Sequence, residues 1–145
     1  MQPGSLILLV DDNDNDLALF KAAVSKAGLD LTLVGTGNGQ QAIDYLQRVR
    51  DSDRRPNIIV LDLRMPLKDG FDFLAWHKSS RYASIPVVVF TGWGDRTERQ
   101  RALSSGADLV LEKPLKFDQL VDVVRTIGIL GSAATSKRES AVLIS

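Results

Sequence analysis

The sequence predicts an α/β fold built on one doubly wound parallel sheet. Five short apolar runs alternate along the chain with five segments of helical periodicity, the order typical of strands joined by crossover helices. The run at residues 6–10 is unbroken by polar residues, which indicates a strand buried on both faces of the sheet. A length of 145 residues without an internal repeat or break predicts a single domain.

The strands and helices can be placed in chain order. The apolar runs predict strands at residues 6–10, 31–34, 57–61, 87–90 and 109–111. Apolar residues at helical spacing predict helices near residues 14–27, 40–49, 71–75, 95–105 and 117–130. Gly28, Gly106 and Gly131 are expected to end three of these helices. The helix near residues 95–105 is mostly polar, so we expect it to be the most weakly held.

The end of the chain predicts a boundary between a folded domain, residues 1–131, and a tail, residues 132–145. In the last helix, Val123 and Leu130 widen the apolar stripe beyond what packing on the sheet requires. Two explanations stay open. The flank packs under the neighbouring helix, or it forms a homodimer interface to which the tail segment Val142–Ile144 contributes.

Composition and charge exclude several classes of protein. The 18 basic residues balance 18 acidic ones, and no basic stripe is present, so a nucleic-acid partner is not indicated. The absence of cysteine excludes disulfide and thiolate chemistry. No apolar run approaches the length of a membrane span, and the first residues do not form a signal peptide. We expect a cytoplasmic protein.

Reactive polar residues follow four of the five predicted strands: Asp11 and Asp12, then Asp62, Thr91 and Lys113. The carboxyl ends of parallel strands share one edge of the sheet, so these side chains should converge. Three crowded carboxylates repel each other unless a cation neutralises them, and a hard divalent ion such as Mg²⁺ or Mn²⁺ suits oxygen ligands. An aspartate beside a metal, a lysine and a hydroxyl is equipped to attack a phosphoryl group.

The ordered set of motifs resembles the receiver domain of two-component response regulators over residues 6–130. The motifs are Asp11-Asp12, residues 61–66 (LDLRMP) with Asp69-Gly70, Thr91-Gly92 and Lys113-Pro114. The resemblance implies a flavodoxin-like (βα)5 three-layer sandwich with strand order 2-1-3-4-5. It further implies that Asp62 is the phosphoacceptor. Asp11, Asp12, Asp62 and the backbone carbonyl of Arg64 would hold the metal, Thr91 would be the switch hydroxyl, and Lys113 would contact the phosphoryl group.

The same resemblance yields finer expectations. The Lys113–Pro114 peptide bond should be cis, as is usual in the family. The position three before the lysine, usually aromatic, is Val110, so Thr91 would switch without an aromatic partner. Arg64 and Trp93, with Gly92 beside them, occupy positions that tune the lifetime of the phosphoryl group.

A receiver implies a sensor histidine kinase as partner and output by contact with a downstream protein. The long loop before the third strand and the tail resemble, more weakly, the stand-alone regulators that serve bacterial phytochromes. Such a chain would catalyse only its own phosphorylation and dephosphorylation, and would not be an enzyme in the ordinary sense.

Other interpretations of these motifs were weighed. Asp11 and Asp12 alone would suit helix capping. The acidic run 12–16 imitates a calcium loop, but it has Leu17 in place of the required glycine. The glycine-rich segment 35–39 lacks the third glycine of a dinucleotide fingerprint and predicts a turn. His77, the single histidine, is expected at the surface.

Two other functions compete with the receiver interpretation. A haloacid-dehalogenase-like phosphatase would carry a second aspartate two residues after Asp62, where this chain has Arg64. A binding module that is not phosphorylated would have a vestigial pocket, whereas here all five pocket residues are present.

Overall fold

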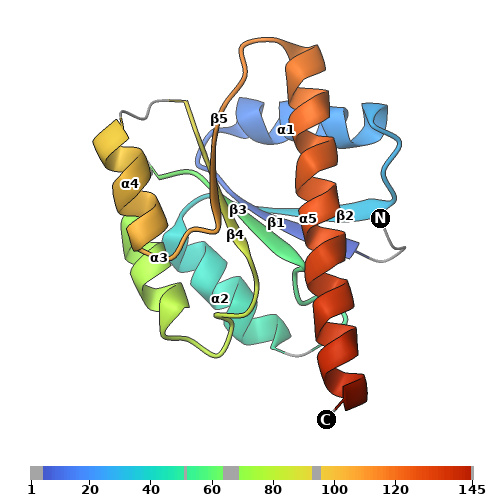
Figure 1. Cartoon of the computed structure of the whole chain (residues 1–145). Coiled ribbons are helices and arrows are strands. Elements are labelled where there is room, and N and C mark those ends of the chain that lie inside the picture. Colours follow the sequence, from blue (N-terminus) through green and yellow to red (C-terminus); the bar gives the residue numbers. More distant parts are fainter. Residues whose placement is uncertain (1–4, 51, 64–68, 93–95, 145) are drawn as a thin grey trace.

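A computed structural model describes residues 5–50, 52–63, 69–92 and 96–144, with side chains up to Gly131. Five strands form one parallel sheet with the order β2-β1-β3-β4-β5, and helices cover both faces (Figure 1). The strands are β1 (Ser5–Val10), β2 (Leu31–Thr36), β3 (Ile58–Leu61), β4 (Val87–Thr91) and β5 (Leu109–Glu112). The helices are α1 (Asp14–Lys26), α2 (Gly39–Val49), α3 (Gly70–Lys78), α4 (Arg96–Ser104) and α5 (Phe117–Ile144). The predicted flavodoxin-like three-layer fold and its strand order are confirmed.

Two apolar layers enclose the sheet, one on each face. Successive residues of a strand point to opposite faces, so Leu8 and Val10 of β1 join one layer while Ile7 and Leu9 join the other. The first layer is completed by α2, α3 and Ala102 of α4. The second layer is completed by α1 and α5. Every residue of β1, β3 and β4 is buried, which explains why their sequences are continuously apolar.

Helix α1 begins and ends close to the predicted residues, and it is capped by Asn13 rather than by Asp11 or Asp12. Its N-cap is Asn13, whose side-chain oxygen accepts hydrogen bonds from the N–H groups of Asn15 and Asp16. This leaves Asp11 and Asp12 without a capping task. After the helix, Gly28 adopts a φ of +70°, a left-handed conformation that glycine accommodates without strain.

Helix α4 is weakly attached to the rest of the molecule. Ala102 is its one buried residue, and Leu103 is 46% exposed. Arg101 adds a contact with α3, because its guanidinium lies 3.8 Å from the centre of the Phe71 ring. The expectation of a poorly anchored helix agrees with this sparse burial.

Helix α5 is longer than predicted. We expected it to end at Gly131, but it continues to Ile144 and projects beyond the sheet (Figure 1). A single glycine in a helix costs only about 1 kcal/mol relative to alanine, and the alanine, lysine, arginine and glutamate residues that follow favour helix. Val123 and Leu130 pack partly buried against the second apolar layer, so the flank that they form is not surplus.

His77 is buried, and the prediction of a surface histidine was wrong. It is 4% exposed and its ring stacks on Phe73 with 6.0 Å between ring centres. Helix α3 buries Gly70, Phe73, Leu74 and His77, which share one face at helical spacing. The missed signal was this spacing, because polarity alone had placed the histidine outside.

Among the described residues, no helix has both the length and the apolar character needed to span a membrane.

Candidate functional site

Asp11 and Asp62 are held at one edge of the sheet by their own backbones. The N–H of Asp62 donates to the carbonyl of Val10 at 2.9 Å, and the N–H of Asp11 donates to the carbonyl of Thr36 at 2.9 Å. Both bonds extend the ladders of the central strands by one residue. The two side chains are 12% and 3% exposed for Asp62 and Asp11 respectively. The sheet therefore brings together two carboxylates that lie 51 residues apart in the sequence.

Asp12 completes an acidic group with these two residues. One carboxylate oxygen from each of Asp11, Asp12 and Asp62 lies within 4.8 Å of the others. Oxygen ligands at such spacing fit a hard divalent cation. Asp12 is exposed, so the group opens to solvent on one side. The donor set and its geometry fit the Mg²⁺ or Mn²⁺ ion expected from the sequence.

The ammonium of Lys113 lies among three carboxylates. Its Nζ is 2.9 Å from Asp11, 2.8 Å from Asp16 and 3.2 Å from Asp62. Burial would lower the pKa of Lys113, but hydrogen bonds to Asp16 and Asp11 and the charges of Asp62 and Asp11 raise it above its ordinary value. The lysine is therefore a fixed positive charge beside Asp62.

For the pKa of Asp11, burial outweighs the hydrogen bonds, whereas for Lys113 the hydrogen bonds and charges outweigh burial. Burial raises its pKa above the ordinary aspartate value, although hydrogen bonds from Lys113 and from the N–H of Asn13 act to lower it. The nearby charge of Asp62 raises it further. A bound divalent cation would favour the ionised form of this carboxylate, so the buried acid is better suited to a metal than to solvent.

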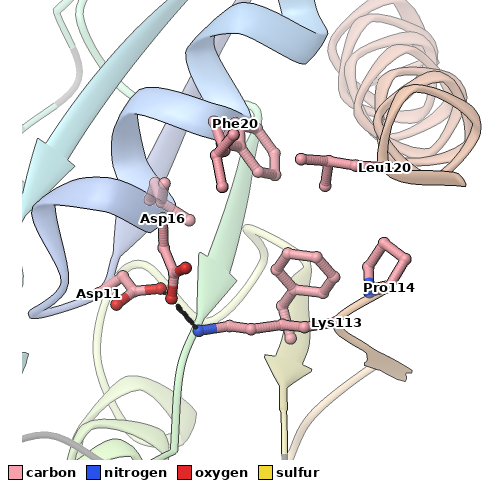
Figure 2. A pocket seen from close by; sticks show the side chains of 9 residues that line it. Asp11, Asp16, Phe20, Lys113, Pro114 and Leu120 are labelled. Atoms are coloured by element: carbon pink, nitrogen blue, oxygen red, sulfur yellow. Dashed lines mark hydrogen bonds and ion pairs between the residues drawn. The ribbon is translucent and has the colours of Figure 1, made fainter. Parts of the chain in front are cut away.

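Asp16 belongs to the site, although the sequence did not indicate it. An acid in the first turn of a helix ordinarily lies at the surface as a partner of the helix dipole. Instead its carboxylate reaches Lys113, as Figure 2 shows for Asp11, Asp16 and Lys113. Asp16 lies in the first turn of α1, which follows directly on Asp11 and Asp12, and this closeness in sequence is the signal that could have found it.

Thr91 and Gly92 lie at the carboxyl end of β4, next to Lys113. The N–H of Lys113 donates to the carbonyl of Thr91 at 2.8 Å, and Thr91 is 4% exposed. A Cβ added to Gly92 would lie 3.8 Å from Cδ of Lys113. Val110 is buried in the first apolar layer and carries no aromatic ring toward the site.

Two expectations fall outside the described residues, and one is overturned. Arg64 and Trp93, predicted to line the pocket, belong to segments that the structure does not describe. The Lys113–Pro114 peptide bond is trans, since the described residues contain no cis bond, so the predicted cis bond was wrong. The expectation came from resemblance alone, and trans is the usual form of bonds before proline.

A small cavity borders the stem of Lys113. It measures about 60 Å³ and is lined by apolar side chains of β1, α1, β4 and α5, with Asp11, Asp16 and Lys113 at its polar end (Figure 2). Phe20, Pro114 and Leu120 are among its walls. A space of this size holds a few water molecules and not a cofactor.

Comparison with known proteins gives the same answer as this geometry. The sequence matches the family profile of the response regulator receiver domain over residues 7–125. This chain belongs to the response regulator receiver family. One curated relative, a probable methanogenesis regulatory protein, FilR2, of Methanothrix harundinacea, is 36% identical over 84% of this chain and 80% of its own length.

Solved receiver structures superpose on this chain. The phosphorylated cyanobacterial phytochrome response regulator RcpA has a TM-score of 0.76 and 30% identity, with 85% of this chain and 90% of RcpA covered. The response regulator Rcp1, solved in its Mn²⁺-bound form, has a TM-score of 0.73 and 30% identity, covering 85% and 91%. The resemblance to receivers, including those associated with phytochromes, is confirmed.

Membership in the family establishes a general role. Receiver domains are modules of phosphorylation-based signalling, generally not enzymes, and they bind a divalent metal in an acidic pocket. The aspartate group at the edge of the sheet supplies such a pocket in this chain.

Proposed function

We propose that this protein accepts a phosphoryl group from a sensor histidine kinase on Asp62, with Mg²⁺, and signals by contact with a downstream protein. The observation that supports this proposal is the position of Asp62. Its carboxylate lies 3.2 Å from a lysine ammonium and within the acidic group formed with Asp11 and Asp12. Asp11 has the same two neighbours, but its side chain is only 3% exposed, whereas that of Asp62 is 12% exposed and so more open to a phosphoryl donor.

The transfer is a displacement at phosphorus. A carboxylate oxygen of Asp62 attacks the phosphorus of a phosphohistidine, a P–O bond forms, and the P–N bond breaks. The electron pair of that bond stays on the imidazole nitrogen. Lys113 meets the charge that develops on the phosphoryl oxygens, because its ammonium already lies beside Asp62. The hydroxyl of Thr91 is the proposed partner of another phosphoryl oxygen after transfer.

The proposed metal ligands are Asp11, Asp12, Asp62 and the backbone carbonyl of Arg64. When bound, the ion would neutralise negative charge on the phosphoryl oxygens and on the acidic group. Asp11 contributes a carboxylate that burial keeps close to the sheet edge, and Asp12 contributes one from the solvent side. Arg64, Trp93 and Gly92 are proposed to tune the phosphoryl lifetime by limiting the access of water.

The decisive experiment is incubation with acetyl phosphate and Mg²⁺, followed by intact mass. We expect one added phosphoryl group, which Asp62→Asn abolishes because an amide is not a nucleophile. Removing Mg²⁺ with a chelator should abolish the product as well. Addition of phosphate to the Asp62→Asn variant would contradict the assignment of the acceptor.

The same assay distinguishes the competing functions. Continuous release of phosphate from phosphate esters would indicate a phosphatase with an aspartyl intermediate. That outcome is disfavoured because Arg64 occupies the place of the second aspartate. Absence of any reaction would indicate a binding module with a vestigial pocket.

The partners are proposed from the relatives. The kinase is proposed to be a bacterial phytochrome, because RcpA is a phytochrome response regulator of similar structure. We place the protein in the cytoplasm with no nucleic-acid or membrane partner. A homodimer through α5 and residues 132–145 is also proposed, although packing of Val123 and Leu130 on the core removes one of its supports.

A further inference from the structure

We propose that Asp16 is a positioning residue, whose carboxylate holds the ammonium of Lys113 in the orientation that the phosphoryl group on Asp62 requires. This inference rests on the proposed function. It assigns a role to Asp16, which is neither the proposed acceptor nor one of the proposed metal ligands.

The contact of Asp16 is the shortest that Lys113 makes. Its oxygen lies 2.8 Å from Nζ, against 2.9 Å for Asp11 and 3.2 Å for Asp62. Asp16 does not belong to the group of three acids that fits a metal. A cation would take one oxygen from each of the other two carboxylates, whereas Asp16 keeps both of its oxygens for the lysine.

The number of N–H donors on the ammonium explains how the contact with Asp16 can fix the orientation of Lys113. A protonated lysine has three N–H donors, and three carboxylates surround Nζ. Asp11 and Asp16 occupy two donors, so the third points toward Asp62. A phosphoryl group on Asp62 would meet that third donor without any rotation of the ammonium. Loss of Asp16 would free one donor and allow the group to turn.

The stem of Lys113 does not provide this orientation by itself. A lysine stem has four flexible carbons, and here it lines the cavity of about 60 Å³ beside Pro114 and Leu120 (Figure 2). A stem that borders open space is less restricted than one in a close-packed core. The direction of the ammonium is therefore set mainly by the carboxylates at its end.

Asp16 is itself held in place by the start of α1. Its N–H donates to the side-chain oxygen of the N-cap Asn13 at 3.1 Å. The capped first turn brings the Asp16 carboxylate from α1 toward the residue that follows β5. Asp16 is 36% exposed in its side chain, so replacement by asparagine should not prevent folding.

The first test observes Lys113 directly in metal-free protein. Hydrogen-bonded lysine ammonium groups exchange slowly with water, so ¹⁵N-labelled protein should show an ammonium signal that Lys113→Met removes. We expect Asp16→Asn to abolish or greatly broaden this signal. The matched control is Asp14→Asn, which removes an exposed acid from the same helical turn and should leave the signal unchanged.

The second test measures the rate of phosphorylation by acetyl phosphate at saturating Mg²⁺. We expect Asp16→Asn to be slowed about tenfold, Asp14→Asn to stay within about twofold of wild type, and Asp16→Glu to recover part of the loss. The affinity for Mg²⁺ is measured separately by calorimetry. An Asp16→Asn variant that is slow at low Mg²⁺ but matches wild type at saturating Mg²⁺ would overturn the proposal, because Asp16 would then act on the metal.

The outcomes separate the two proposals. If wild type is phosphorylated and Asp16→Asn matches Asp14→Asn in signal or in rate, the role of Asp16 is refuted while the proposed function stands. If wild type is not phosphorylated, the proposed function fails, and with it the role of Asp16 toward a phosphoryl group. A slowed Asp16→Asn variant with a lost ammonium signal supports both.

Discussion

At the scale of single residues, the backbone after Asp62 depends on the absence of a side chain at Gly70. A Cβ built on Gly70 would lie 2.5 Å from Cα of Leu63 and 2.7 Å from the carbonyl oxygen of Asp62. Backbone atoms at such distances cannot yield as a flexible side chain does. The start of α3 and the proposed acceptor, Asp62, are therefore packed directly against each other.

We predict that Gly70→Ala lowers the free energy of unfolding by about 1–3 kcal/mol, as overpacking does, and slows phosphorylation by displacing Asp62. Urea unfolding and the acetyl phosphate assay measure the two effects. The control is Gly131→Ala, whose Cβ would have an ordinary contact of 3.6 Å with Ile58 and should stabilise α5 by about 0.5–1 kcal/mol. Equal stability of the two variants would contradict this account.

His77 makes stability depend on pH. Burial lowers its pKa in the folded protein below the ordinary value, so the unfolded chain binds a proton more readily. Its contribution is fully present above the unfolded pKa of about 6.5 and is lost as the pH falls toward the lower folded value. The free energy of unfolding of wild type should decrease between about pH 7 and pH 5.

The variant His77→Phe, which keeps an aromatic ring on Phe73, should remove the part of this decrease that His77 causes. Urea unfolding at each pH is the measurement. The raised pKa of Asp11 acts in the opposite direction, because the folded state then takes up its proton more readily as the pH falls toward about 4. Comparison of the two proteins cancels that shared effect, and identical slopes would argue against the role of His77.

At the scale of elements, α2 and α4 differ in how they are held. Helix α2 buries six residues, among them Ile43 and Leu46, while α4 buries Ala102 alone. Opening a helix exposes its buried apolar surface, so an element with little burial opens at low cost. An element of this kind is easily biased by events at a neighbouring strand end such as Thr91.

We predict that backbone amides of α4 exchange with deuterium faster than those of α2 by at least about tenfold, in the metal-free protein. Hydrogen exchange read by mass spectrometry or NMR provides the comparison. Phosphorylation should change protection in α4 more than in α2, which serves as the internal control. Equal protection of the two helices would contradict the inference from burial.

The elements also show what sequence periodicity can and cannot predict. Apolar runs identified all five strands, and most clearly β1, β3 and β4, because strands covered on both faces need apolar residues at nearly every position. Periodicity did not predict the end of α5, because a glycine such as Gly131 commonly ends a helix, whereas here the residues beyond it favour helix. The burial of His77 was missed because polarity was weighed above its helical spacing with Phe73.

The residues of the site also differ in how well the sequence predicts them. Residues at the ends of strands were predictable, since a parallel sheet places all its carboxyl ends at one edge and Asp11, Asp62 and Lys113 follow directly. Asp16 was not predictable in this way, because its contact depends on the length of the Lys113 side chain and on the turn of α1. The trans bond before Pro114 could not be derived from the sequence, where resemblance had indicated cis.

At the scale of the whole molecule, α5 combines two different segments. Up to Gly131 it packs on the sheet through residues such as Val124 and Ile127, which are fully buried. Its continuation to Ile144 extends past the body of the protein (Figure 1). We retain the proposal that residues 1–131 fold as the receiver and that residues 132–145 are an appendage.

We predict that a chain ending at Gly131 unfolds cooperatively, with a free energy of unfolding within about 1 kcal/mol of the full chain. Its helical circular dichroism signal should fall in proportion to the residues removed. Analytical ultracentrifugation of both chains tests the proposed homodimer. A full-length dimer with a monomeric truncated chain would support a role for the appendage, and dimers of both would exclude it.

The ladder bonds of Asp11 and Asp62 have a consequence for the timing of signalling. Because these amides donate hydrogen bonds to neighbouring strands of the sheet, we expect them to open less readily than the amides of α4. In the proposed function, the acceptor carboxylate would therefore keep its place in the sheet while α4 responds. The duration of the proposed signal would then be set by the lifetime of the phosphoryl group on Asp62. The response to it would lie in α4, the weakly held helix.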